Sequence, residues 1–123
     1  GISRLELLMD LPNVPIALRV EAGYKRGNAW ENKGESVKAK AAYFDLYDSY
    51  VVEEMRIDQL GEGGQYWLSR AMFKLAEMFE DQTELDRAIE FYEEIEALGL
   101  FGDSVARTRK DRLMGSVPFV ESQ

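Results

Sequence analysis

The side chains in this sequence that could do chemistry are carboxylates, lysines and tyrosines, because the chain contains no histidine and no cysteine. Without these two residue types there is no Ser-His pair, no thiolate nucleophile and no zinc site built on Cys or His. A helical di-metal carboxylate site also uses a Glu-x-x-His pair, which is missing here. We therefore expect that the protein is not an enzyme and carries no cofactor, and carboxylate catalysis is kept only as a minor alternative.

Acidic clusters are the remaining candidates for a metal site. Two of them could supply oxygen ligands to calcium or magnesium: Glu53, Glu54 and Asp58, and further along Glu90, Glu93 and Glu94. Neither cluster has the residue spacing of a calcium-binding loop, and acidic helix faces are usually solvated. We predict no metal site in either place.

A glycine-rich run, Gly61-Glu62-Gly63-Gly64, is the one candidate for a phosphate-binding loop. Such loops let backbone amides approach an anion, and they follow a strand and precede Lys-Ser or Lys-Thr. Neither the strand nor the lysine is present, and Glu62 carries the wrong charge. The run is interpreted as a turn between two helices.

The charge of the chain is strongly uneven. Of the net charge of −8, residues 77–96 account for all of it, with nine acidic side chains and only Arg87 against them. An acidic domain is repelled by phosphates, which disfavours nucleic acid as a partner. The acidic segment could meet a basic partner protein, or it could pair with the basic cluster Arg107, Arg109, Lys110 and Arg112; the second alternative is slightly preferred. Apolar runs are too short for direct membrane insertion.

Helical signals dominate, and no segment has the alternation of a strand. The pattern predicts an all-α fold of five to six helices: about 2–10, opened by a Ser3/Glu6 capping box; 16–32; 36–60; 65–80; 83–97, capped by Thr83; and 103–114. Residues 1–15 are expected to form a short leading helix and a proline-rich connector. Residues 16–114 are expected to form the main domain, and residues 115–123 an irregular tail.

Two windows of the chain share one spacing. A small residue is followed after three positions by an aromatic one, after twelve by Ala, after sixteen by Tyr and after nineteen by an aliphatic one. The windows are Gly27, Trp30, Ala39, Tyr43, Leu46 and then Ala76, Phe79, Ala88, Tyr92, Ile95. Small residues let two helices approach closely, and the aromatic residue one turn on fills the space beside them. The spacing predicts two antiparallel helix pairs.

These windows resemble the tetratricopeptide repeat family. Residues 26–30, Arg-Gly-Asn-Ala-Trp, followed by Ala39 and Tyr43, are similar to the core motif of that family. The resemblance implies a short right-handed solenoid with units at about 20–50 and 69–102 and a cap helix at 103–114. The chain departs from the family in one respect: Ala39 and Ala88 lie 49 residues apart, against about 34 in the family. The difference places an insertion at residues 50–65.

The resemblance also implies a function. Members of the family bind a peptide or a helix of another protein in a groove lined by the first helix of each pair. Carried over to this chain, the groove residues are Glu21, Tyr24, Asn28, Glu31, Arg70, Phe73, Glu77 and Arg107, with Asp81 and Asp111 beside them. A clamp for a C-terminal carboxylate would need Lys where Tyr24 stands, so that subclass of ligand is not expected.

Two alternatives to an adaptor or scaffold remain open. The chain could be a structural end unit of a longer repeat protein or a self-associating domain, and the groove side chains could simply pack on neighbouring helices. The compartment cannot be derived from the residues. Analogy with acidic repeat proteins of bacterial envelopes gives only a weak preference for the periplasm over the cytoplasm.

Overall fold

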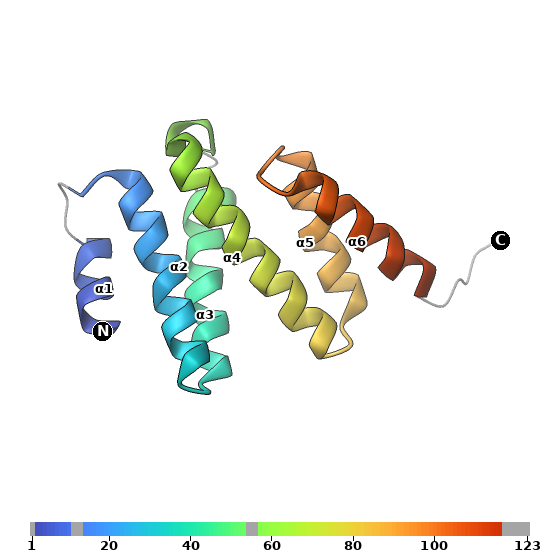
Figure 1. Ribbon diagram of the computed structural model, residues 1–123, viewed down its shortest axis with the longest axis horizontal. Helices are drawn as coiled ribbons and strands as arrows, with labels where there is room; N and C mark the ends of the chain where they lie inside the picture. The colour runs from blue at the N-terminus through green and yellow to red at the C-terminus, as the bar shows by residue number, and fades with distance from the viewer. Residues whose placement is uncertain (1, 11–13, 54–56, 117–123) are drawn as a thin grey trace.

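The structure is a computed structural model that describes residues 2–10, 14–53 and 57–116 (Figure 1). Helices make up most of these residues. The elements are α1 (Ile2–Asp10), α2 (Ile16–Asn32), α3 (Ser36–Tyr47), the π-helical η1 (Asp48–Glu53), the 3₁₀ helix η2 (Ile57–Leu60), α4 (Gly61–Asp81), α5 (Leu85–Ala97) and α6 (Asp103–Ser116). No strand occurs within these three ranges. The predicted all-α fold is therefore confirmed.

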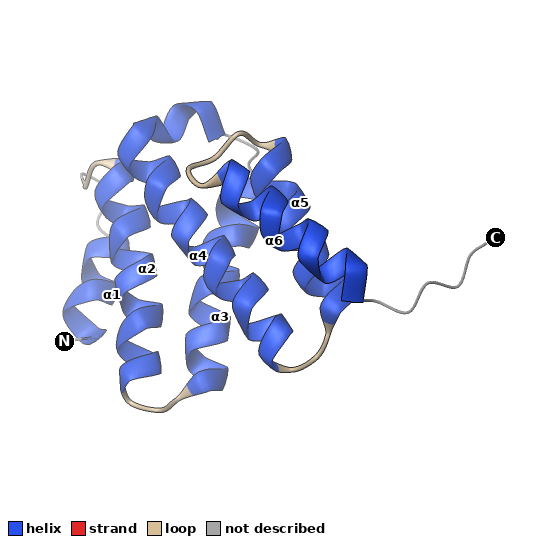
Figure 2. Cartoon of the chain, turned by 45° about the vertical axis from the view of Figure 1, so that its right-hand side comes forward, coloured by secondary structure: helices blue, strands red, loops and turns tan. Residues whose placement is uncertain are grey.

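The helices pack in chain order and lie in two layers. Helix α1 packs on α2, α2 on α3 and α4, α3 on α4, α4 on α5, and α5 on α6. In Figure 1, α2, α4 and α6 lie in front of α3 and α5, and Figure 2 shows the short loops that join α2 to α3 and α4 to α5 at one end of the molecule. The first helices of the two pairs and α6 thus share one face.

The two helix pairs, α2–α3 and α4–α5, turn in the same way. Gly34 and Thr83 occupy equivalent positions in the two loops and both have a positive φ, +76° and +59°. The next amide in each loop donates to a carbonyl five residues back: Glu35 N to Trp30 O and Glu84 N to Phe79 O, both at 2.9 Å. This is the hydrogen-bond pattern that commonly ends an α-helix at a left-handed residue. The internal repeat found in the sequence is therefore also present in the backbone.

A tyrosine hydroxyl closes each pair from inside. Tyr43 of α3 donates to Glu31 Oε1 of α2, and Tyr92 of α5 donates to Glu80 Oε2 of α4. Both tyrosine side chains are fully buried. Burial, together with the adjacent carboxylate, raises the pKa of Tyr43 and of Tyr92 far above the ordinary value. The equivalent positions of the two pairs therefore share a buried polar bond, which the sequence spacing alone did not predict.

The small residues of the repeat lie where the helices cross. Ala39, Ala76 and Ala88 have no exposed surface. At Gly27 a Cβ atom would overlap the ring of Tyr43, so only glycine lets α2 and α3 come this close. The small residues of the repeat therefore allow the close helix contacts that the sequence spacing predicts.

The segment between the pairs differs from the prediction. One helix was expected from Ser36 to about Leu60, but α3 ends at Tyr47 and continues as η1 and η2. The glycine run was expected to be a turn, whereas α4 begins at Gly61 and includes it. A Cβ on Gly63 or Gly64 would lie 3.6 or 3.7 Å from Ala17 of α2. Contacts of that length are ordinary, and the tight approach in this run is that of a Cβ on Gly64 to the Leu60 side chain, at 2.9 Å. Gly61 takes the left-handed φ of a turn, +70°, so the predicted turn is present at Gly61, whereas Gly63 and Gly64 lie inside α4.

Two predicted helix caps are also wrong. Helix α1 begins at Ile2, so Ser3 lies inside it, and α5 begins at Leu85 with Glu84 at the N-cap position. Thr83 instead takes the left-handed position of the loop, and its hydroxyl donates to Gln82 O at 2.6 Å. Helix α6 extends to Ser116 instead of about Met114. Most of the predicted tail, residues 117–123, and part of the connector, residues 11–13, lie outside the described residues.

The close contact at Gly27 makes a prediction about stability. Gly27→Ala should lower the free energy of unfolding by about 1–3 kcal/mol, because the added methyl group collides with Tyr43. The ordinary gain of about 1 kcal/mol for Ala over Gly in a helix would not offset this collision. Urea unfolding followed by circular dichroism measures the change. Gly115→Ala, whose Cβ meets nothing within 4 Å, is the matched control and should not destabilise; equal stability of both variants would contradict the packing argument.

The buried tyrosines make a second prediction. Tyr92→Phe should cost about 1 kcal/mol at pH 7 through the lost hydrogen bond. The difference from the wild type should shrink as the pH rises above the unfolded tyrosine pKa of about 10. The raised pKa keeps Tyr92 protonated in the folded state while the unfolded state loses its proton, so the wild type alone loses this stability. Denaturant unfolding of both proteins between pH 7 and 11 provides the measurement, and a difference that stays constant would contradict it. Tyr43→Phe should behave in the same way.

Candidate functional site

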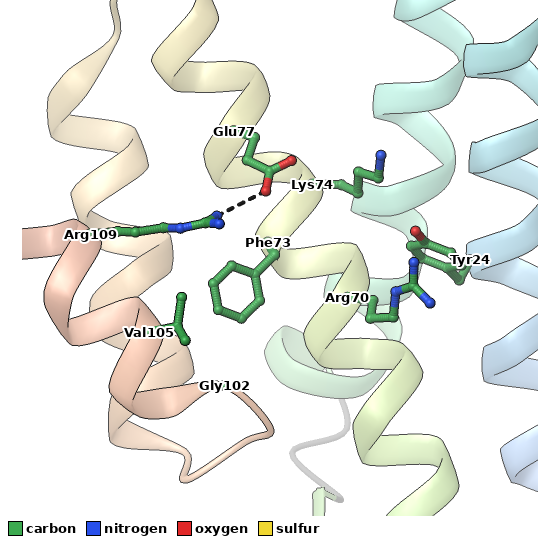
Figure 3. A pocket seen from close by; sticks show the side chains of 8 residues that line it. All are labelled: Tyr24, Arg70, Phe73, Lys74, Glu77, Gly102, Val105 and Arg109. Carbon is green, nitrogen blue, oxygen red and sulfur yellow. Dashed lines mark hydrogen bonds and ion pairs between the residues drawn. The ribbon is translucent and has the colours of Figure 1, made fainter.

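A cleft of about 420 Å³ opens on the face shared by α2, α4 and α6 (Figure 3). Its lining comes from three places in the chain: Tyr24 of α2; Arg70, Phe73, Lys74 and Glu77 of α4; and Gly102, Val105 and Arg109 in and before α6. The volume is at the lower end of the range of ligand pockets. Because the cleft runs between helices and is open to solvent, its shape suits part of an extended chain.

Aromatic rings form the floor of the cleft. Tyr24 is 3% exposed, and its ring centroid lies 5.4 Å from that of Trp67 and 5.7 Å from that of Tyr43. Phe73 is half-buried and lies 5.9 Å from Tyr92 by ring centroids. Tyr43 and Tyr92 are the tyrosines that close the two helix pairs, so both pairs support this floor.

Arg70 lies at one side of the floor. Its guanidinium carbon is 4.8 Å from the centre of the Tyr24 ring and 5.4 Å from that of Trp67. One guanidinium nitrogen donates to Tyr66 Oη at 3.2 Å. Burial lowers the pKa of Arg70, but the neighbouring Tyr24 and Tyr66 raise it by more. Aromatic faces attract a cation without cancelling its charge, so Arg70 presents a fixed positive group to the cleft.

Two ion pairs form the remaining charged walls. Lys74 Nζ lies 3.3 Å from Glu31 Oε1, and Arg109 donates to Glu77 Oε2 at 2.9 Å. The Arg109 guanidinium also lies over Phe73, 5.4 Å from the ring centre. These four side chains are between 29% and 46% exposed, and pairs of that exposure contribute little stability. They can therefore exchange partners at little cost.

Four of the predicted groove residues, Tyr24, Arg70, Phe73 and Glu77, line this one cleft. Glu31 lies beside it and reaches it through Lys74. The other predicted residues do not line the cleft. On α2, Glu21 pairs with Lys25 and Asn28 is half-buried. Asp81 borders a second hollow with Val37 and Met78. On α6, Asp111 is exposed and Arg107 donates a hydrogen bond to Glu96 of α5.

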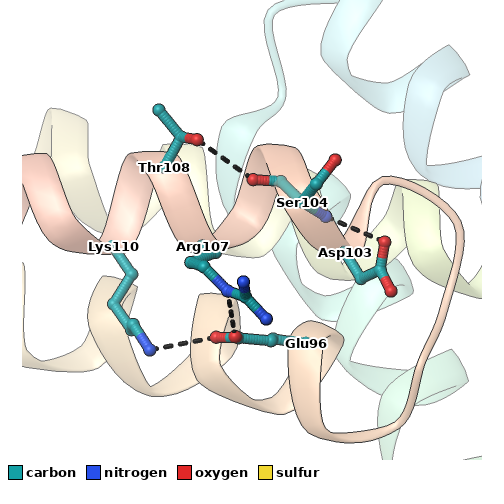
Figure 4. Close-up of polar contacts among 6 residues, drawn as sticks. All are labelled: Glu96, Asp103, Ser104, Arg107, Thr108 and Lys110. Carbon is teal, nitrogen blue, oxygen red and sulfur yellow. Dashed lines mark hydrogen bonds and ion pairs between the residues drawn. The ribbon is translucent and has the colours of Figure 1, made fainter.

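Arg107 and Arg109 show why helix phase matters. Figure 4 shows Arg107 and Lys110 both directed at Glu96 of α5, at 2.5 and 2.9 Å. Residues two apart on an α-helix lie on nearly opposite sides, so Arg109 faces α4 where Arg107 was expected to. The sequence spacing also did not identify Lys74 and Val105 as lining residues. Each is one turn from another lining residue, Arg70 and Arg109, and this spacing of four could have identified them.

The acidic segment is matched in part inside the molecule. Glu96 accepts from Arg107 and Lys110, and Glu80 from Arg112, while Glu94 accepts from Tyr47 of α3. Hydrogen bonds from Lys110 and Arg107 lower the pKa of Glu96. Of the two alternatives for the acidic segment, pairing with the basic helix is therefore the one observed.

The described residues contain neither a candidate metal site nor a helix that could span a membrane. Among them, no three carboxylates are grouped to hold a metal ion; Glu54 of the first acidic cluster lies outside the described residues. No helix among residues 2–10, 14–53 and 57–116 is both long enough and apolar enough to cross a membrane. The chain matches no known family model, no curated protein and no solved structure.

The pairing of Glu96 makes a prediction about acid stability. Because its pKa is lowered in the folded state, the stability it contributes is present above the unfolded pKa of about 4.3 and is lost as the pH falls through the folded pKa. Glu96→Gln should therefore be less stable than the wild type at pH 6, and the difference should vanish towards pH 2. Thermal unfolding across this range measures it. Glu62→Gln, an exposed acid at the start of α4, is the control; a pH-dependent difference of the same size there would contradict a specific role for Glu96.

Proposed function

We propose that this chain is a tetratricopeptide-like interaction module, an adaptor or scaffold that holds an extended peptide or a helix of a partner protein. The binding site is the cleft between α2, α4 and α6. The observation that carries the proposal is the combination of an aromatic floor with charged walls on one open face. Aromatic residues and arginine are the side chains that most often dominate binding at protein interfaces.

The repeated helix pairs support the family assignment. The two loops, the buried tyrosine–glutamate bonds and the alanines at the crossings recur at the same spacing in both pairs. Helix α6 supports a role as a cap, since it carries charged side chains on most of its surface, as helices that end a repeat array do. The inserted η1–η2 segment distinguishes this chain from a regular array.

The lining of the cleft supports binding over catalysis. Glu77 is the only carboxylate that lines it, and that carboxylate is already paired with Arg109. His, the usual general acid or base, and Cys are absent from the sequence. The titratable side chains that line the cleft besides Glu77 are Tyr24, Lys74 and two arginines, and Lys74 is already paired with Glu31. Val105 is 46% exposed and Phe73 half-buried, so apolar surface is available to a ligand.

Self-association is the second candidate function. It is favoured by exposed apolar side chains outside the cleft, of which Leu18 and Val52 are 50% and 56% exposed. Such side chains could stack on a second copy of the chain. They are separate from the cleft residues, so the two functions can be tested independently.

Val105→Trp tests the cleft without changing its charge. The indole should fill the space above Phe73, and we expect a loss of at least about tenfold in the amount of partner captured from a lysate of the source cells. Val52→Trp, at an equally exposed position on η1, is the matched control and should capture the partner as the wild type does. Circular dichroism checks that both variants remain helical.

Three outcomes of this experiment separate the hypotheses. Loss of the partner with Val105→Trp alone supports the cleft. Equal capture by all three proteins shows that another face binds and refutes the proposal. Self-association is supported instead by three results together. No partner is captured, the apparent mass in sedimentation equilibrium increases with protein concentration, and Val52→Trp changes that increase.

A further inference from the structure

We propose that the cleft selects an acidic segment within a partner protein, one that places an apolar side chain between two carboxylates. This inference rests on the proposed function and specifies its ligand. The apolar side chain would lie on Phe73 and Val105, and the carboxylates would bind Arg70 and Lys74 on one side and Arg109 on the other.

The charge of the cleft is opposite to that of the chain. The whole sequence carries a net charge of −8, yet the cleft is lined by three cations, Arg70, Lys74 and Arg109, and one anion, Glu77. Glu31 lies beside the cleft and pairs with Lys74, so that one positive charge, the charge of Arg70, is in excess. A concave site of one sign attracts ligands of the other sign and raises their rate of association. Within this acidic molecule the cleft is therefore a positive site, and it favours an acidic ligand.

Arg70 is the cation of the cleft whose surroundings most favour an acidic ligand. Among the described residues it has no carboxylate partner; its contacts are the hydroxyl of Tyr66 and the rings of Tyr24, Tyr66 and Trp67. The rings hold the guanidinium group in place while leaving its full charge. An arginine that is oriented but not neutralised suits the binding of a ligand carboxylate, which it can hold with two parallel hydrogen bonds.

Geometry determines the order of groups in the ligand. Figure 3 shows Arg70 and Lys74 on the side of α4 that faces Tyr24, Arg109 and Val105 together on α6 across the cleft, and the ring of Phe73 between the two sides. Arg70 and Lys74 are one helical turn apart, so the first acid of an extended segment can reach either of them. A second acid beyond the apolar side chain would meet Arg109, which its exposed pair with Glu77 leaves available.

The same geometry favours an internal segment over a chain end. The three cations are spread along both sides of Phe73, whereas the capture of one terminal carboxylate needs donors gathered at one point. The acidic surface of α5, with Glu90 and Glu93 exposed, would repel an acidic partner from the other layer. An acidic segment is thereby directed to the face that carries the cleft.

A library of random 12-residue peptides displayed on phage as N-terminal fusions tests this inference, because no displayed peptide has a free C-terminus. The library is selected separately on the wild type, on Arg70→Gln and on the control Arg87→Gln, which removes an exposed cation of α5 that pairs with Glu90. We expect the wild type and the control to enrich sequences with Asp or Glu on both sides of an aromatic or aliphatic residue. Arg70→Gln should not enrich them.

The most enriched sequence is then synthesised, capped at both ends, and its affinity measured by fluorescence anisotropy. We expect a Kd about tenfold higher for Arg70→Gln, a change of less than about twofold for Arg87→Gln, and weaker binding at high salt because exposed charges are screened. A version with a free terminal carboxylate should bind equally well.

Each other result overturns the inference in a recognisable way. The wild type could enrich neutral or basic sequences, and Val105→Trp could abolish that enrichment. This result refutes the acidic ligand but leaves the cleft as the binding site. Binding that requires the free terminal carboxylate refutes the internal segment. If no sequence is enriched above background, the acidic inference is wrong, and if Val105→Trp also leaves partner capture unchanged, the proposed function fails with it.

Discussion

The hydrogen bond from a buried tyrosine to a glutamate is the interaction on which both helix pairs depend. Glu31 accepts a hydrogen bond from Tyr43 within its own helix pair and pairs with Lys74 of the next helix in the face, α4. Glu80 does the same with Tyr92 and with Arg112 of α6. Each carboxylate therefore closes one pair and joins it to the element that follows. A buried hydroxyl without this acceptor would cost about 1–3 kcal/mol, so the tyrosine determines where the glutamate must lie.

The cleft depends on this arrangement. The carboxylate of Glu31 lies 3.3 Å from Lys74 at the edge of the cleft, and the ring of Tyr43 supports Tyr24 beneath Arg70. In the second pair, Tyr92 supports Phe73 from below. The aromatic floor of the cleft is therefore an extension of the core, and the buried tyrosines hold its shape. A preformed site loses less conformational entropy on binding than a flexible one.

Much of the fold could be predicted from spacing, because small and aromatic residues at fixed intervals have few other uses. Gly27 with Tyr43, and Ala76 with Tyr92, determine two helix pairs whatever the chain does between them. Gly61 takes the left-handed conformation that the predicted turn needs, but a helix begins at once, so Gly63 and Gly64 lie in α4 beside Ala17. For the cleft, the spacing named residues of α2 and α4 that line it, but it named Arg107 instead of Arg109 because the register of α6 against α4 is set by tertiary contacts.

Helix α6 contributes charges both to ion pairs with its neighbours and to the lining of the cleft. Its cations lie around most of its circumference: Arg107 and Lys110 bind Glu96 of α5, Arg112 binds Glu80, and Arg109 faces the cleft. Such a helix can cover the apolar end of the second pair through Ala106 and Leu113, which are 0% and 6% exposed, while keeping its outer surface polar. Arg107, Lys110 and Arg112 bind glutamates of α4 and α5 in the same register in which Ala106 and Leu113 are buried. That register also places Arg109 beside the cleft, so the packing of α6 determines where this cation lies.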